Sequence, residues 1–187
     1  MAVSRACWSR RLKNLVIEAR INHGRNSTPS FLIVDSQTVR NTETGCWKGY
    51  DAGKKVSGIK RHIAVDTLGL PHALAISSAG VSDRLGAVYA IAQKRRDLQG
   101  IEAVMCDGGY TGGDFAAAIK HLIGADVQIA KRSEMHKFKV IPKRWIVERS
   151  FAWIDKCRRL WRNCERLPNT SKQFVFLAFL SITLRRI

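Results

Sequence analysis

The sequence predicts an α/β fold in which a mixed sheet of five strands carries flanking helices. Three observations support this prediction: short apolar runs rich in β-branched residues, a glycine-centred hairpin, and strands that alternate with helical patterns late in the chain. Alternating strands and helices are typical of parallel neighbours, whereas a hairpin adds an antiparallel pair, so the sheet is mixed. In such sheets, functional residues gather at strand ends.

The first half of the chain predicts one helix and three strands. Residues 1–22 have the apolar spacing of an amphipathic helix, and residues 31–39 form an apolar run typical of a buried strand. Residues 62–77 predict a hairpin that turns at a Leu-Gly pair. The polar, basic and glycine-containing residues 40–61 predict a loop.

The second half alternates helices and strands. We expect, in order, a helix over 83–96, a strand over 101–109, a helix over 114–124, a strand over 126–132, a long helix over 143–162 and a buried closing helix over 174–184. Ser82 and Asp114 are predicted N-caps of the first two of these helices, and Gly124 is predicted to end the second.

The charge of the chain predicts a polyanionic partner. Lys plus Arg number 32 against 15 Asp plus Glu, which gives a formal net charge of +17 at pH 7. A polyanion relieves the self-repulsion of such a chain, and nucleic acid is the expected one. The five cysteines form no Cys-x-x-Cys pair, and no apolar signal core or membrane-spanning run is present in the sequence. We therefore expect a reduced, cytoplasmic protein without a membrane partner.

Two carboxylates interrupt apolar runs. Asp35 follows Phe-Leu-Ile-Val, and Asp107 follows Val-Met-Cys and precedes two glycines. Burial of a carboxylate costs several kcal/mol unless another group compensates it. A divalent cation would compensate it, and Mg²⁺ is commonly held by one or two carboxylates. Alone, Asp107 is more readily an ordinary turn residue, because Asp and Gly are common in turns. Asp66, beside the hairpin turn, is likewise expected to serve the turn.

A third carboxylate, Glu148, lies in the last long helix. There it shares a face with Arg144, four residues earlier, and also with Asp155 and Arg159. A helical Glu between arginines is most often a solvated ion-pair partner, so spacing alone does not assign it to a site.

Four segments together resemble the DDE transposases of bacterial insertion sequences, in the group around insertion sequence five: IVDSQTV, GYDAGKKVSGIKRHIAVDTLGL, CDGGY and RWIVERSFAW. The resemblance runs from about residue 31 to about residue 166. It implies an RNase H-like catalytic domain over 31–187, after an N-terminal helical region over 1–30. It also implies that Asp35, Asp107 and Glu148 are the catalytic residues and hold Mg²⁺, which Mn²⁺ can replace.

The family also has a Tyr, Arg, Glu and Lys signature along the last long helix. Arg144 matches it, whereas Ile141 stands where the family has Tyr and Asp155 stands where it has Lys. Lys156 is one place later, a rotation of about 100° on a helix.

Two basic segments, 54–62 and 131–144, flank the predicted triad in sequence and are expected to contact phosphates. The expected DNA-contacting residues are Lys54, Lys55, Lys60, Arg61, Lys137, Lys139, Lys143, Arg144 and Lys156. Trp47 and Tyr50 are candidates for stacking on an unpaired base, whereas Trp145 and Trp153 are expected in the core.

The resemblance predicts a transposase that cleaves and joins duplex DNA, at the element ends and the target, as a homo-oligomer. Two alternatives are an RNase H-like nuclease without strand transfer and an inactive, decayed transposase-derived DNA-binding protein. Only 34 residues precede Asp35, fewer than in many relatives, so we expect a second-frame product or an N-terminally shortened copy.

Overall fold

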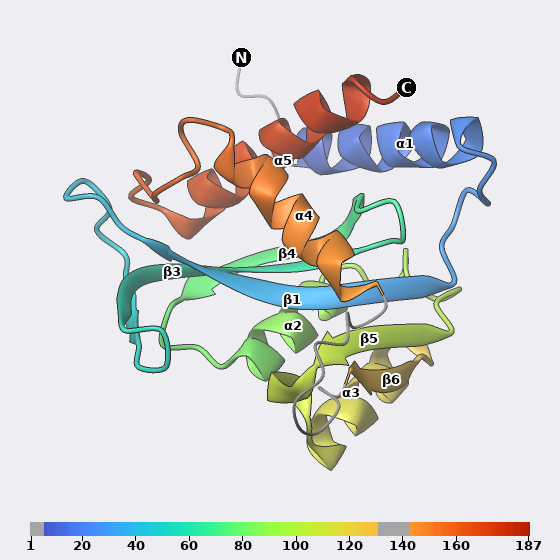
Figure 1. Ribbon diagram of the computed structural model, residues 1–187, viewed down its shortest axis with the longest axis horizontal. Helices are drawn as coiled ribbons and strands as arrows, with labels where there is room; N and C mark the ends of the chain where they lie inside the picture. Colours follow the sequence, from blue (N-terminus) through green and yellow to red (C-terminus); the bar gives the residue numbers. More distant parts are fainter. Residues whose placement is uncertain (1–5, 131–142) are drawn as a thin grey trace, which may run out of the picture.

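The computed structural model describes residues 6–130 and 143–187, and it has three layers, with helices on both faces of a mixed sheet (Figure 1). The elements are α1 (Ala6–Asn22), β1 (Phe31–Arg40), β2 (Gly49–Asp51), β3 (Val56–Val65), β4 (Pro71–Ser78), α2 (Asp83–Ala92), β5 (Ala103–Asp107), the 3₁₀ helix η1 (Gly108–Tyr110), α3 (Gly113–Ile123), β6 (Asp126–Ala130), α4 (Arg144–Asp155) and α5 (Pro168–Leu184). No helix in this described part of the chain is long and apolar enough to cross a membrane.

The sheet is mixed, as predicted. β1 pairs antiparallel with β3 and parallel with β5, and β5 pairs parallel with β6. The other side of β3 pairs with β4 and, over residues 56–58, with β2. All five predicted strands are present, and β2 is a short sixth strand.

The predicted loop over 40–61 is wrong at both ends, because β1 extends to Arg40 and β3 begins at Val56. Gly58 explains the error. A Cβ at this position would lie 1.9 Å from the carbonyl oxygen of Val39, so glycine permits the close approach of β3 to β1. The glycine that indicates a loop in the sequence is therefore a strand residue.

Alternate side chains of β1 face opposite helical layers. Ile33 and Val39 pack into the core formed with α1, α4 and α5, whereas Leu32 and Val34 pack into the core formed with α2 and α3. Asp35 has the parity of Ile33, so its side chain lies on the face that α4 covers.

Two of the three predicted caps are confirmed. The Ser82 hydroxyl accepts a hydrogen bond from the Leu85 amide at 3.3 Å, and Gly124 ends α3 with a φ of +74°. Asp114 is not the N-cap of α3; Gly112 holds that position, and Asp114 lies in the first turn.

Helix α4 ends at Asp155, seven residues before the predicted end at residue 162. Tertiary contacts replace the helical hydrogen bonds beyond that point. The Leu160 carbonyl accepts a hydrogen bond from Arg61 Nη2 at 2.6 Å, and the Asn163 amide donates to the Arg40 carbonyl at 3.0 Å.

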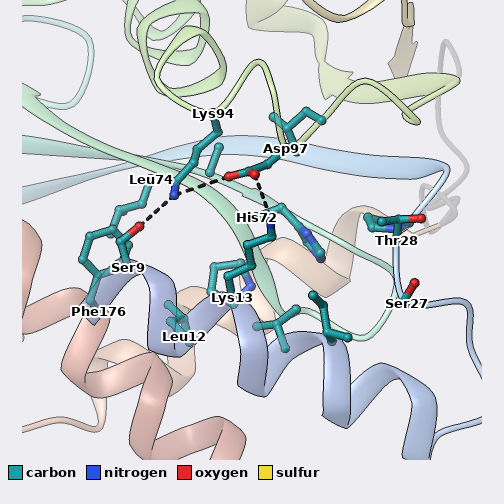
Figure 2. Close-up of a pocket in the computed structure, with 16 residues that line it drawn as sticks. Ser9, Leu12, Lys13, Ser27, Thr28, His72, Leu74, Lys94, Asp97 and Phe176 are labelled. Carbon is teal, nitrogen blue, oxygen red and sulfur yellow. Dashed lines mark hydrogen bonds and ion pairs between the residues drawn. The ribbon is translucent and has the colours of Figure 1, made fainter. Parts of the chain in front are cut away.

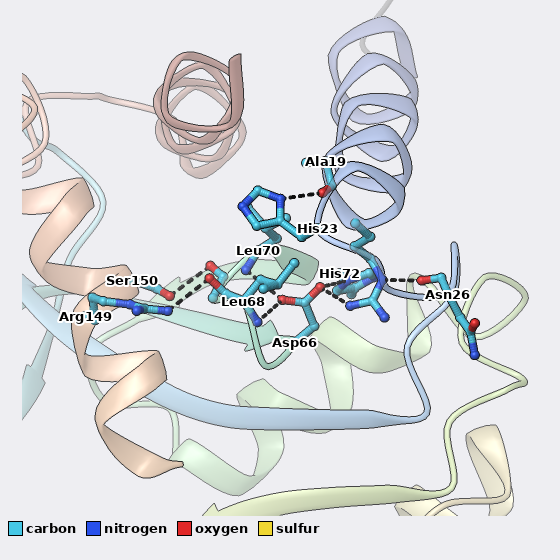
Figure 3. Close-up of polar contacts among 11 residues, drawn as sticks. Ala19, His23, Asn26, Asp66, Leu68, Leu70, His72, Arg149 and Ser150 are labelled. Atoms are coloured by element: carbon cyan, nitrogen blue, oxygen red, sulfur yellow. Dashed lines mark hydrogen bonds and ion pairs between the residues drawn. The ribbon is translucent and has the colours of Figure 1, made fainter. Parts of the chain in front are cut away.

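Asp66 serves the β3–β4 turn, as predicted, and also connects this turn to α1 (Figure 3). Its Oδ1 accepts hydrogen bonds from the amides of Leu68 and Leu70 at 2.9 and 3.0 Å. Its Oδ2 pairs with Arg20 of α1 and, at 3.1 Å, with His72. Ser150 of α4 donates to the carbonyl of Gly69 in the same turn.

His62, which is fully buried beneath α2, makes the fold sensitive to acid. Its ring contacts the Ser77 hydroxyl at 2.7 Å, and burial lowers its pKa from 6.5 to about 4. Since the folded state holds this imidazole neutral, protonation below pH 6.5 favours the unfolded chain, and the stability lost accumulates down to about pH 4. Protonation of His62 should thus lower the free energy of unfolding of the wild-type protein by about 2 kcal/mol between pH 7.5 and pH 5.

Urea unfolding of wild type and His62→Gln at these two pH values checks the prediction. We expect the variant to be less stable at pH 7.5 but to lose less stability on acidification. An equal loss in both proteins would assign the acid sensitivity to other groups.

Candidate active site

The parallel pairing of β1 with β5 brings two of the predicted carboxylates together. Ile33 pairs with Met105, so Asp35 and Asp107 each follow two residues later on the same face of the sheet. Both side chains line one small cavity, which Arg144 and Val147 of α4 close from above. The strands and α4 therefore converge on these two carboxylates.

The two carboxylate oxygens of Asp107 have different neighbours. Its Oδ1 accepts a hydrogen bond from the Gly109 amide at 2.9 Å and caps η1, which is the ordinary turn role. Its Oδ2 lies 3.5 Å from Arg144 Nη2 and faces the cavity. Gly108 and Gly109 turn the chain away and are exposed, so they leave this oxygen accessible.

Asp35 lies in a strongly desolvating position. Its pKa is raised to about 6, mainly by burial and also by the nearby negative charge of Asp107, while the hydrogen bond from the Ser36 amide and the charge of Arg144 act to lower it. The Ser36 amide donates to Asp35 Oδ1 at 2.7 Å. Protein groups in the described chain therefore compensate the Asp35 charge only in part. Two close carboxylates, one of them poorly compensated, are a donor set that fits Mg²⁺.

Arg144 connects Glu148 to this pair. The Arg144 Nε lies 3.3 Å from Glu148 Oε1, four residues along α4, while its Nη2 faces Asp107. The Glu148 side chain is 57% exposed, so it reaches the site only through the guanidinium. Among the described residues, no three His, Cys, Asp or Glu side chains cluster closely enough to hold a metal. The structure thus places Asp35 and Asp107 at one cavity and connects Glu148 to Asp107 through Arg144.

Four of the predicted DNA-contacting lysines are exposed. Lys54 and Lys55 lie in the turn between β2 and β3, and Lys143 and Lys156 flank the two ends of α4. Lys137 and Lys139 lie outside the described residues.

Lys60 and Arg61, by contrast, are only 5% and 1% exposed and have partners inside the protein. Lys60 Nζ donates to the Val81 carbonyl and pairs with Asp83, both at 2.9 Å. Arg61 donates to the Leu160 carbonyl at 2.6 Å and to Gln37 at 3.1 Å. The two charges are therefore buried ion-pair and hydrogen-bond partners within the fold, and they are not accessible to DNA.

The aromatic residues also differ from expectation. Trp145, predicted in the core, is 48% exposed, and the Arg149 guanidinium stacks 4.6 Å from the centre of its ring. Trp153 is partly buried and packs against Gly69. Trp47 and Tyr50 are exposed, which leaves them accessible for stacking.

Sequence reasoning missed how the end of α4 contacts β1. Asp155, which stands where the family signature has Lys, accepts with its Oδ2 a hydrogen bond from Gln37 Nε2 at 2.7 Å. The only signal in the sequence was a polar residue, Gln37, two places after Asp35 on the same face of a strand. The exposed Trp161 was missed as well, because residues 156–162 read as a continuation of the helix.

A second hollow lies between α1 and β4, away from the carboxylates (Figure 2). Its lining is mainly apolar, and none of its residues lines the carboxylate cavity. Its charged groups pair with their neighbours: Lys13 with Asp97 at 2.6 Å, and Lys94 with Ser9 at 2.7 Å (Figure 2). It offers no chemistry comparable to the carboxylate site.

Comparison with solved structures supports the fold. The chain resembles a chain of the simian T-cell lymphotropic virus intasome in complex with PP2A regulatory subunit B56 gamma, with a TM-score of 0.54, 14% identity and coverage of 83% of this chain and 49% of that chain. It also resembles the catalytic core domain of BIV integrase, with a TM-score of 0.50, 11% identity and coverage of 83% and 94%. At such identities the likeness concerns the fold alone, which is the expected RNase H-like sheet with flanking helices.

Comparison of sequences identifies the family. One curated relative, named "Putative transposase for insertion sequence element IS402" from Burkholderia cepacia, is 34% identical over 139 residues. These residues are 69% of this chain and 65% of that protein, so this chain spans about two thirds of the relative's length. The family model described as "Transposase DDE domain" matches residues 26–184. The chain therefore belongs to the DDE transposase family of bacterial insertion sequences.

Proposed function

We propose that this chain is a DNA transposase that catalyses metal-dependent phosphodiester cleavage and strand transfer of an insertion sequence element. The observation that carries the proposal is the shared cavity of Asp35 and Asp107, with Arg144 linking Glu148 to it. Membership of the DDE transposase family and a net charge of +17 support DNA as the substrate.

Asp35 and Asp107 would hold Mg²⁺, or Mn²⁺ in its place, and Glu148 would complete the site. Such ions supply Lewis acidity and activate water or a 3′-hydroxyl for in-line attack on a phosphodiester. Arg144 keeps Glu148 close to the two aspartates and partly neutralises Asp107. The large exposure of Glu148 allows its side chain to change partner without rearranging α4.

The exposed lysines 54, 55, 143 and 156, together with residues 137 and 139, would contact DNA phosphates, and a homo-oligomer would assemble on the DNA. We also propose residues 31–187 as the catalytic domain and 1–30 as an N-terminal region. Helix α1 contributes Leu12, Val16 and Ala19 to the core that contains α5, so this region is packed on the catalytic domain.

An assay with supercoiled plasmid that carries the chain's gene and its flanking DNA tests the proposal. With Mg²⁺ we expect nicks at the element ends and products in which a 3′ end is joined to target DNA; without divalent metal we expect neither.

Nicking without joining would instead identify a nuclease. Binding without nicking in either Mg²⁺ or Mn²⁺ would contradict catalysis and leave a DNA-binding protein.

A further inference from the structure

The connection between α4 and α5 is strongly basic, and we name residues 156–166 the basic loop. It contains five basic residues and one acid, Glu165. The basic residues are Lys156, Arg158, Arg159, Arg162 and Arg166. Glu165 is engaged by Arg159 at 2.8 Å, so the other four basic side chains have no acidic neighbour within the loop.

Hydrogen bonds attach the basic loop to the end of β1. The Asn163 amide donates to the Arg40 carbonyl at 3.0 Å, and the Thr42 amide donates to the Asn163 carbonyl at 2.9 Å. The buried Asn163 side chain also donates to Asn41 Oδ1 at 2.9 Å. Leu160 packs into the core. These contacts hold the loop backbone in place, so the loop presents its side chains in a fixed arrangement.

The basic loop exposes an aromatic side chain as well as basic ones. Trp161 is 61% exposed, and the Arg162 guanidinium stacks 4.6 Å from the centre of its ring. Lys156 and Arg158 are exposed beside it. Asn41, which binds the Asn163 side chain, also holds the segment of a second exposed tryptophan. Its Nδ2 donates a hydrogen bond to the Trp47 carbonyl at 3.0 Å. Positive charge interleaved with exposed aromatic rings is typical of surfaces that bind nucleic acid with unpaired bases.

The basic loop follows β1 away from the active site (Figure 1). Asp155, just before the loop, bonds Gln37, two residues beyond Asp35 on the same face. Asn163 pairs with Asn41, six residues beyond Asp35. At about 3.3 Å per strand residue the loop reaches about 20 Å from Asp35. This distance corresponds to roughly six base pairs of duplex DNA at 3.4 Å each.

We propose that the basic loop is a second DNA-contacting surface. Lys156, Arg158 and Arg162 contact phosphates of the DNA that leads away from the cleavage site, and Trp161 stacks on an unpaired base. The inference rests on the proposed function for its choice of DNA. Apart from Lys156, it assigns a role to loop residues that neither the triad nor the expected DNA-contacting residues include.

One loop variant and a matched control test the phosphate contacts. The loop variant is Arg158→Gln with Arg162→Gln; the control is Arg95→Gln with Arg96→Gln, which removes the same charge from exposed positions after α2. Binding to blunt duplex is measured without divalent metal, over a range of salt. We expect the slope of log affinity against log salt to fall by about 1.8 in the loop variant and to remain unchanged in the control.

Trp161→Ala tests the stacking. On duplex with a single-stranded 3′ tail we expect binding to weaken about fivefold or more, while binding to blunt duplex is unchanged. Trp161→Phe should restore most of the preference for the tail, because its ring also stacks.

Equal slopes in the loop and control variants would overturn the phosphate contacts. Unchanged binding of Trp161→Ala to tailed DNA would overturn the stacking, and a simultaneous loss of self-association in sedimentation would identify the loop as a contact between copies. Because these measurements need no cleavage, failure of the catalytic proposal leaves them interpretable: a chain that binds through the loop without cutting DNA contradicts only the proposed function.

Discussion

Replacing Asp35 by Asn should reduce DNA cleavage in Mg²⁺ by about 10³-fold or more while DNA binding persists. The substitution removes the charge of a proposed metal ligand from the cavity that Asp35 shares with Asp107. Metal ions contribute several kcal/mol to stabilising charge in the transition state, and about 4 kcal/mol corresponds to a factor of 10³ in rate.

Asn has nearly the same shape as Asp, and the fold should tolerate it. Burial and the charge of Asp107 raise the Asp35 pKa to about 6, so the charged carboxylate is unfavourable in the folded protein near neutral pH. A neutral side chain should therefore leave stability unchanged or increase it, which separates loss of catalysis from loss of structure.

Single-turnover cleavage and metal-free DNA binding are the measurements for Asp35→Asn. Asp114→Asn is the matched control, since Asp114 is exposed in the first turn of α3 and lies outside the cavity. The control should cleave at the wild-type rate. Cleavage by Asp35→Asn within tenfold of that rate would contradict the assignment of Asp35 as a metal ligand.

The proximity of Asp35 and Asp107 could be predicted from the sequence, because each interrupts an apolar strand and a buried carboxylate requires a compensating partner. Glu148 could not be found this way, since a helical Glu beside an Arg is common at protein surfaces. Its assignment depended on the family resemblance, and the structure adds the bond from Arg144 that brings it near Asp107.

The errors share one physical cause: local sequence does not record tertiary partners. Residues 156–162 have acceptable helix propensity, yet the chain leaves the helix because Arg61 and the end of β1 bind its backbone. Lys60 and Arg61 look like loop residues, yet β1 and β4 on either side turn their segment into a central strand. A charged side chain in such a strand signals an internal partner that only the fold reveals.

The largest loss of stability is expected from Asp66→Ala. Asp66 is 1% exposed and pairs with the buried Arg20 and with His72, while two amides of the β3–β4 turn donate to its other oxygen (Figure 3). Removing one partner of a buried ion pair costs about 3–5 kcal/mol, because the remaining charge is left uncompensated. A typical domain has a total stability of about 5–15 kcal/mol, so this variant should be close to unfolding.

The stability that Asp66 contributes to the fold should decrease as the pH falls. Burial alone would raise the pKa of Asp66, but the hydrogen bonds and charge of His72 and the bonds from Leu70 and Arg20 hold it below its ordinary value of 3.8. A carboxylate with a depressed pKa stabilises the fold above its unfolded-state pKa and loses that contribution as the pH falls through the folded value. The difference between wild type and Asp66→Ala should therefore be full at pH 7 and shrink below about pH 4.

Urea unfolding at pH 7 provides the measurement, with Asp97→Ala as the control. Asp97 pairs with Lys13 at 2.6 Å, but both side chains are substantially exposed, and such surface pairs contribute about 0–1 kcal/mol. The stability lost in Asp66→Asn should lie between the losses in Asp66→Ala and Asp97→Ala. Its amide oxygen still accepts a hydrogen bond from the turn, but the charge on Arg20 loses its partner. If Asp66→Ala proved no more destabilising than Asp97→Ala, the buried pair would not be what holds α1 and the β3–β4 turn together.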